Sequence, residues 1–181
     1  MTKYGVLVGS LRQHSYSRGV AAALVAGLPA DAKVTYLEIG ELPLYNQDYD
    51  EASPASYTAF RKVVKAQDAF IFVTPEHNRS IPAVLKNALD IASRPFGENV
   101  WANKPALVAS ESISGISGAL ANRVLHQTLD FLDVPIMQQP ELFIGNVGTL
   151  TDDRGQITNA DTKAFLADSG HQFSQFVTNY R

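Results

Sequence analysis

The residues best placed to do chemistry follow the first apolar run of the chain. Residues 9–18 read GSLRQHSYSR and carry three serine hydroxyls and two guanidinium groups directly before a helix-like segment. A helix begins with unpaired backbone N–H groups and the positive end of its dipole, and both attract phosphate. Hydroxyls donate to phosphate oxygens, and arginine adds charge with a forked donor geometry. This loop therefore predicts a phosphate site, with candidate ligands Ser10, Arg12, Ser15 and Ser17.

The competing interpretation of this loop is a polar turn in which Ser17 is the helix N-cap. Two common phosphate motifs, GxGxxG and GxxxxGK[ST], are absent, so a Rossmann fingerprint and a P-loop both lose support. The sequence has no cysteine, and its four histidines lack metal-ligand spacing. We therefore predict no metal site and no side chain acting as nucleophile, general acid or general base.

A second polar segment, residues 74–80 (TPEHNRS), directly follows an apolar run. It can serve a ligand, or it can be a turn in which Asn78 and Ser80 shape the chain and cap the next helix while Glu76 and His77 are solvated. Capping is expected of Ser80 in either case. A third segment, residues 110–118 (SESISGISG), could bring hydroxyl and N–H groups to a ligand edge or be a flexible connection.

The elements that must position these loops alternate between strands and helices. Five β-rich apolar runs are predicted at residues 4–8, 34–39, 69–73, 105–109 and, less sharply, between 135 and 144. Several are apolar throughout, which is typical of strands buried on both faces of a parallel sheet. Helical spacing is predicted over residues 17–28, 53–66, 82–93, 117 or 118 to 132, and 159–180.

The helices are expected to bury specific apolar residues. These are Phe60, Val63 and Val64 in the second helix, Leu120, Val124, Leu125 and Leu129 in the fourth, and Phe165, Phe173 and Phe176 in the last.

Alternating β and α segments without a linker or repeat predict one doubly wound α/β domain over residues 1–181. Five strands favour the flavodoxin-like order 2-1-3-4-5, with helices on both faces. In that order the sheet reverses direction between strands one and three, and ligands bind at their carboxyl ends, as FMN does in flavodoxin. Both polar loops leave these two strands, which is the strongest indication of a binding site.

Composition excludes several other classes of protein. The net charge of −3 is too weak a field to indicate nucleic acid or an anionic membrane as the main partner. No apolar stretch approaches the roughly 20 residues needed to span a bilayer. No secretion signal is recognised, so a cytoplasmic enzyme is expected.

Five segments carry a resemblance to a known family: GSLRQHSYSR (9–18), LPLYNQD (42–48), TPEHNRSIPAVLKNALDIASRP (74–95), WANKPALVAS (101–110) and ALANRVLHQTLDFLDVP (119–135). They resemble the NADPH-dependent FMN reductase family, especially its branch of bacterial chromate, quinone and azo-dye reductases. The resemblance covers most of the chain except its C-terminal part. It implies a flavodoxin-like fold, bound FMN, NADPH or NADH as co-substrate, and a homodimer or homotetramer with flavin sites beside subunit interfaces.

The resemblance also implies roles for individual residues. It assigns FMN binding to Ser10, Leu11, Arg12, Ser15, Tyr16, Ser17, Pro75, Glu76, His77, Asn78 and Ser112. The first six match the phosphate loop, the next four line the isoalloxazine, and Ser112 lies near the other ring edge. Asn46, Gln47 and Asp48 match a stretch that approaches the flavin from the dimer interface.

The chain departs from the family pattern at two positions. Ser17 stands where asparagine is usual, and a hydroxyl has a shorter reach to phosphate. His77 stands where tyrosine is usual, and histidine offers less apolar area and can carry charge near neutral pH.

The expected reaction is hydride transfer from NAD(P)H to FMN N5, followed by two-electron reduction of an acceptor in a ping-pong cycle. The acceptor classes left open are quinones, free flavin, azo compounds, nitroaromatics and chromate-like oxyanions, and the preference between NADPH and NADH is also open. One alternative is a flavodoxin-type electron carrier, although such carriers tend to be strongly acidic. Another is a phosphate-binding α/β protein that has lost its flavin.

Overall fold

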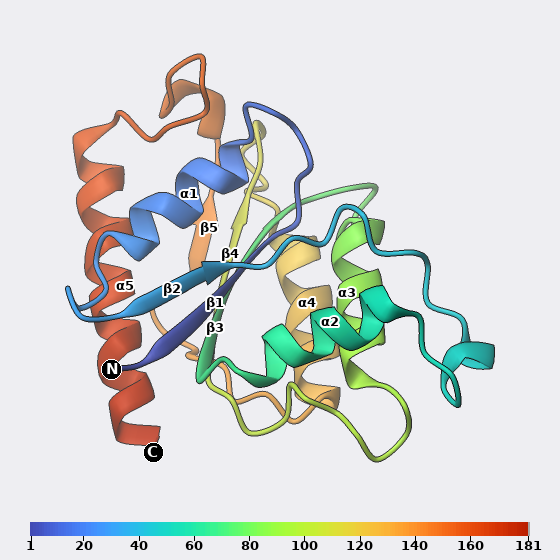
Figure 1. The fold of residues 1–181 in the computed structure, drawn as a ribbon. Helices are drawn as coiled ribbons and strands as arrows, with labels where there is room; N and C mark the ends of the chain where they lie inside the picture. Colours follow the sequence, from blue (N-terminus) through green and yellow to red (C-terminus); the bar gives the residue numbers. More distant parts are fainter. Residues whose placement is uncertain (181) are drawn as a thin grey trace.

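Five strands form one parallel sheet in the computed structural model, which describes residues 1–180 (Figure 1). The strands are β1 (Lys3–Val8), β2 (Lys33–Tyr36), β3 (Ala69–Pro75), β4 (Ala106–Glu111) and β5 (Leu142–Ile144). Their order is β2-β1-β3-β4-β5, so the predicted flavodoxin-like order is confirmed. The predicted second strand is shorter than expected and ends at Tyr36, and the uncertain fifth strand is confined to three residues.

The central strands are aligned so that their carboxyl ends meet at one edge of the sheet. In the pairing of β1 with β3, Val8 lies opposite Val73, and in that of β3 with β4, Pro75 lies opposite Glu111. Nearly every residue of β3 is buried because helices cover both faces of the sheet. The loops that follow β1, β3 and β4 therefore begin side by side, at the top of Figure 1.

The helices form a layer on each face of the sheet (Figure 1). On one face lie α1 (Tyr16–Val25) and α5 (Ala160–Tyr180), which pack on one apolar cluster with Leu24 and Phe173. On the other lie α2 (Ala55–Lys65), α3 (Ala83–Ser93) and α4 (Ala119–Phe131), around the fully buried Trp101. Two short 3-10 helices, Gln47–Tyr49 and Val147–Thr149, lie in connecting segments.

The structure contradicts the alternative interpretation of Ser17 as a helix N-cap and the prediction that Ser80 caps the next helix. The N-cap of α1 is Ser15, whose hydroxyl accepts a hydrogen bond from the Arg18 N–H, whereas Ser17 already lies inside the helix. Ser80 caps no helix, because α3 begins after Pro82 without a side-chain cap. Instead Ser80 exchanges two backbone hydrogen bonds of 2.9 Å with His77.

Three residues expected in the core are partly exposed: Val63 (40%), Leu120 (45%) and Phe165 (42%). Successive residues on a helix are about 100° apart, so Val63 turns outward once its neighbour Val64 faces the sheet. Of the three α5 phenylalanines expected in the core, Phe173 is the one that is fully buried, and its ring packs against Tyr4.

None of the helices within residues 1–180 is long and apolar enough to cross a bilayer. In the same part of the chain, no group of three or more acidic or histidine side chains is arranged to hold a metal ion.

Candidate functional site

The loops after β1, β3 and β4 enclose a cavity of about 490 Å³ at the carboxyl edge of the sheet. We name it the carboxyl-end pocket. Its lining residues are Ser10, Leu11, Arg12, Tyr16, Pro75, Glu76, His77, Glu111, Ser112 and Ile113. The volume lies within the range of roughly 300–1,000 Å³ that is typical of small-molecule sites. This edge includes the β1/β3 switch point, where ligands bind in doubly wound folds.

The loop after β1 supplies the positive charge of the pocket. The Arg12 guanidinium lies 5.0 Å from the centroid of the Tyr16 ring, in cation–π geometry, and forms no ion pair among the described residues. The Ser10 hydroxyl accepts a long hydrogen bond of 3.4 Å from the Arg12 N–H. An exposed cation beside a helix N-terminus can attract an anion, because both present positive charge to the same space.

The loop after β3 forms a tight turn. Asn78 (φ 50°) and Arg79 (φ 66°) both adopt left-handed backbone conformations, and His77 and Ser80 close the turn through their paired backbone hydrogen bonds. Two successive left-handed residues between such a pair define a type I′ turn. The turn places His77 on the pocket wall and Asn78 outside the set of lining residues.

Glu76 fixes this loop to the neighbouring helix. Its carboxylate accepts hydrogen bonds from the Leu120 N–H (3.1 Å) and the Ala121 N–H (3.3 Å) at the start of α4, and from Arg79 (2.7 Å). Burial opposes ionisation of Glu76, but these hydrogen bonds outweigh it and hold its pKa below the ordinary value. The side chain therefore acts as a helix cap from another loop, replacing Gly118, which has no side chain.

Glu111, at the end of β4, is the least expected member of the pocket. It is 5% exposed, and its carboxylate accepts a 2.6 Å hydrogen bond from the hydroxyl of the fully buried Ser17. Burial raises the pKa of Glu111, against the opposing effects of the Ser17 hydrogen bond and the Arg12 charge. The pair joins the first turn of α1 to β4 beneath the loop that the sequence assigns to phosphate.

The structure brings most of the predicted site residues together. Ser10, Leu11, Arg12, Tyr16, Pro75, Glu76, His77 and Ser112 all line the carboxyl-end pocket. Ser15, Ser17 and Asn78 do not, since Ser15 caps α1, Ser17 bonds to Glu111 and Asn78 forms the turn.

Glu111 and Ile113 line the pocket but were not predicted individually. The available signal for Glu111 was an acidic residue at the end of an apolar strand, within the third candidate loop.

Two other arginines of the chain, and the stretch expected at a dimer interface, make contacts outside the pocket. Arg79 pairs with Glu76 and Arg94 pairs with Asp50, at 3.0 Å from its Nε atom. Asn46 accepts a hydrogen bond from the Asp48 N–H and begins the exposed 3-10 helix Gln47–Tyr49, which extends away from the sheet (Figure 1).

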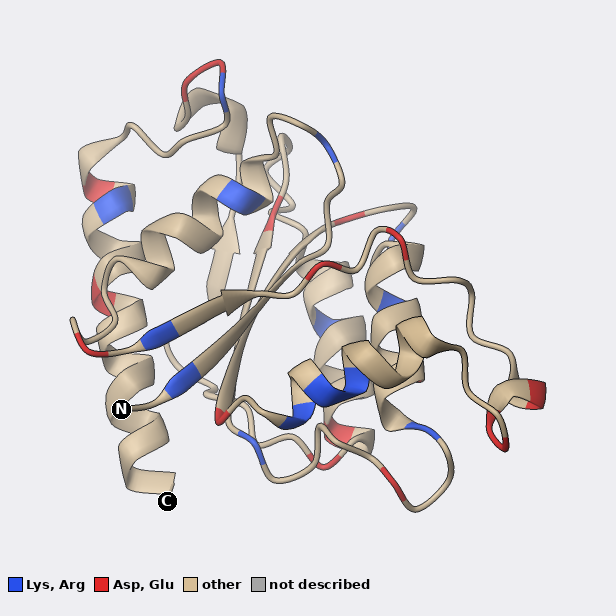
Figure 2. Ribbon diagram, viewed as in Figure 1, with Lys and Arg blue, Asp and Glu red and all other residues tan. Residues whose placement is uncertain are grey.

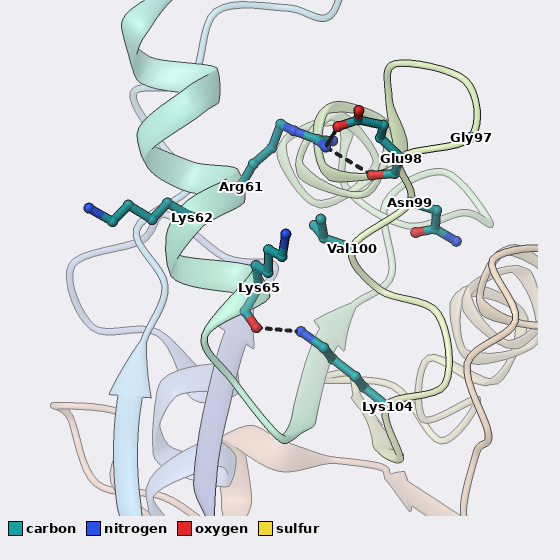
Figure 3. Close-up of a pocket in the computed structure, with 8 residues that line it drawn as sticks. All are labelled: Arg61, Lys62, Lys65, Gly97, Glu98, Asn99, Val100 and Lys104. Atoms are coloured by element: carbon teal, nitrogen blue, oxygen red, sulfur yellow. Dashed lines mark hydrogen bonds and ion pairs between the residues drawn. The ribbon is translucent and has the colours of Figure 1, made fainter.

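A larger cavity, of about 670 Å³, lies at the opposite, amino end of the sheet (Figure 3). We name it the basic cleft; it is lined by Arg61, Lys62, Lys65, Gly97, Glu98, Asn99, Val100 and Lys104. Basic residues gather on α2 near this cleft (Figure 2). Its size does not make it the candidate site, because it lies away from the switch point and its two most buried cations bind backbone carbonyls.

Comparisons with known proteins identify relatives of this chain. Residues 2–149 match the family model described as NADPH-dependent FMN reductase. The chain is 47% identical to a quinone reductase of Pseudomonas putida, over 95% of this chain and 92% of that protein. It is 40% identical to a 2-hydroxy-1,4-benzoquinone reductase of a Burkholderia species, over 99% and 98%.

Among solved structures, the chain is similar to a flavoenzyme NAD(P)H:(acceptor) oxidoreductase from Paracoccus denitrificans. The TM-score is 0.90 and the identity 32%, and the alignment covers 99% of each chain.

Proposed function

The chain belongs to the NADPH-dependent FMN reductase family, and from this premise we propose that its carboxyl-end pocket binds FMN and presents it to NAD(P)H and then to a quinone. The protein is an NAD(P)H-dependent oxidoreductase of the FMN reductase and quinone reductase type. The observation that carries the proposal is the meeting of three polar loops in one cavity at the β1/β3 switch point.

The residues of the pocket fit FMN at both ends of the molecule. Arg12, Ser10 and the N–H groups at the start of α1 offer cationic and hydrogen-bonding partners for the phosphate. Leu11 and Ile113, 63% and 73% exposed, give the pocket rim apolar surface suited to a planar ring.

When bound, FMN would supply the redox chemistry, a two-electron transfer from NAD(P)H to an acceptor. The protein's part is binding and orientation. Arg12 and Ser10 hold the phosphate, while the backbone of Pro75, Glu76 and His77 orients the ring. Glu76 keeps that backbone in place through its bonds to α4 rather than by contacting substrate.

Two further features belong to the proposal. A quinone is the acceptor that the relatives' names favour, while free flavin, azo compounds, nitroaromatics and chromate-like oxyanions are further candidates. A homodimer or homotetramer is part of the proposal through the family resemblance alone. The cytoplasmic location remains a prediction from the sequence.

The test is the visible spectrum of the purified protein, before and after anaerobic addition of NADPH. We expect a flavin spectrum that bleaches on addition and recovers when a quinone follows. A flavin that stays oxidised would instead indicate an electron carrier served by another reductase. A colourless protein that cannot be reconstituted with FMN would overturn the proposal.

A further inference from the structure

The hydrogen bond between Ser17 and Glu111 leaves two polar groups of the phosphate end committed to each other. Both side chains are almost fully buried, and the hydroxyl lies 2.6 Å from the carboxylate Oε1. While this bond forms with an ionised carboxylate, the Ser17 proton points at Glu111 and cannot be given to a ligand. A protonated Glu111 reverses the situation, since the acid can donate to Ser17 and release the hydroxyl proton.

The charges around Glu111 do not neutralise it. Arg12, from the loop after β1, is the nearest cation, but it is exposed and stacked on Tyr16. From the loop after β3, Glu76 adds a second carboxylate that is already paired with Arg79. His77 and Tyr16 are the remaining titratable members of the pocket, and β5 presents the apolar Ile144 opposite Glu111.

An FMN phosphate at the start of α1 would therefore meet a buried carboxylate beneath it. Two anions close together in a partly desolvated site repel strongly, and one of them tends to hold a proton. The single positive charge of Arg12 cannot neutralise both the phosphate and the Glu111 carboxylate. This inference rests on the proposed FMN site.

We propose that Glu111 is a specificity-determining group at the phosphate end of the pocket, which accepts the FMN phosphate when Glu111 is protonated and disfavours it when Glu111 is ionised. FMN binding then takes up a proton at Glu111. Affinity for FMN falls as the pH rises through the ionisation of Glu111, by up to about tenfold per pH unit. Riboflavin has no phosphate, so the charge of Glu111 should change its affinity much less than that of FMN.

The experiment measures the dissociation constants of FMN and riboflavin from the ordinary glutamate pKa of 4.5 up to about pH 9, by flavin fluorescence, on the full chain freed of flavin. The variants are Glu111→Gln, which keeps the shape and acceptor oxygen without charge, and Ser17→Ala. At high pH we expect Glu111→Gln to bind FMN about tenfold or more tightly than the unmodified protein, with convergence at low pH. The phosphate's own second ionisation, near pH 6, is coupled to the Glu111 charge in the unmodified protein, so the decisive difference is read above about pH 8, where free FMN is a dianion.

Ser17→Ala gives an independent test. Loss of the hydroxyl removes a bond that favours the ionised carboxylate, so the pH at which FMN affinity falls should move upward. Glu98→Gln, the same charge change beside the basic cleft, should follow the unmodified protein throughout.

The outcomes separate the two proposals. Parallel pH profiles for the unmodified protein and Glu111→Gln, or an equal effect on riboflavin, would overturn the role of Glu111 while leaving the FMN site intact. Failure of every variant to bind FMN at any pH would overturn the proposed function itself.

Discussion

The two ends of the sheet each carry a cavity lined with charge, and they use that charge differently. In the carboxyl-end pocket, Arg12 faces open space without an acidic partner among the described residues. In the basic cleft, Lys104 donates to the carbonyls of Val64 and Lys65, and Arg61 donates to those of Ile91, Ala92 and Glu98 (Figure 3). The cations of the larger and more basic cavity are thus less available to a ligand than Arg12.

The difference follows from the direction of the strands and helices. Helices that alternate with parallel strands present their N-termini at the carboxyl edge of the sheet and their C-termini at the amino edge. Cations at the amino edge donate hydrogen bonds to the C-terminal carbonyls of α2 and α3 and interact favourably with the negative ends of their dipoles. At the carboxyl edge, the same dipoles favour a ligand's negative charge. Cavity size and lining charge therefore identify a site less reliably than its place in the topology.

Removing the Arg12 side chain is expected to have the largest effect on FMN affinity. Arg12→Ala should weaken FMN binding by roughly tenfold to a hundredfold, because a hydrogen bond to a charged group contributes about 1.5–3 kcal/mol. The measurement is the FMN dissociation constant by fluorescence titration, with riboflavin as the ligand control. A loss that is equal for riboflavin would show that Arg12 does not act on the phosphate.

Glu76 tests whether the pocket wall depends on its bonds to α4. Glu76→Ala should lower the free energy of unfolding by about 1–3 kcal/mol, since it leaves the Leu120 and Ala121 N–H groups without a cap. Glu98→Ala is the matched control at the basic cleft, because Glu98 is 71% exposed and its ion pair contributes about 0–1 kcal/mol. Denaturant unfolding measures both.

The same carboxylate has a defined pH signature. The pKa of Glu76 is lower in the folded protein, so its stabilisation is full above the ordinary value of 4.5 and is lost as the pH falls through the folded pKa. Stability should therefore decline less steeply in acid for Glu76→Ala than for the unmodified protein. Equal slopes would contradict the assigned hydrogen bonds.

Lys104 gives the basic cleft a pH signature in a different range, at alkaline rather than acidic pH. Burial lowers its pKa to about 8, with Asp68 raising it and Lys65 lowering it. Between pH 8 and the ordinary 10.5, the unfolded chain binds a proton that the folded protein does not, so stability gains a contribution that increases with pH. Lys104→Met should remove this contribution, as melting temperatures of the two proteins across that window would reveal.

The smallest effect is expected from the exposed lysines of the basic cleft. Lys62 and Lys65 lie on α2, and the side chain of Lys62 points away from the cleft (Figure 3). The double variant Lys62→Ala/Lys65→Ala should leave the FMN dissociation constant within about twofold, because exposed charges far from a ligand are screened by salt. A tenfold change would show that the cleft contributes to flavin binding and would break the comparison.

The sequence was sufficient for the type and order of the elements. Apolar runs such as residues 69–73 predicted strands buried on both faces, and the strands of the structure follow the predicted order. The predictions of burial were wrong for Val63, Leu120 and Phe165. These residues lie on helices, where a shift of one residue turns a side chain by about 100°. Which edge of a helix's apolar face contacts the sheet depends on residues distant in the sequence, and the spacing within the helix does not reveal them.

The sequence also placed the site at the loops after the first and third strands, because loop chemistry and strand order are both readable from local patterns. It could not assign the partners of individual polar side chains. Ser17 lies 94 positions from Glu111, and Glu76 lies 44 from Leu120, so these bonds exist only once β3, β4 and their helices are packed together.

By itself, the sequence determined the doubly wound fold and the edge of the sheet at which the candidate loops meet, since the elements and their loops are defined by residues close together in the chain. Only the tertiary structure decided which charges are free. It committed Arg61, Arg79, Arg94 and Lys104 to partners, left Arg12 open, and buried Glu111 against Ser17. Free and paired charges look alike in a sequence, because pairing and burial are set by contacts between distant segments.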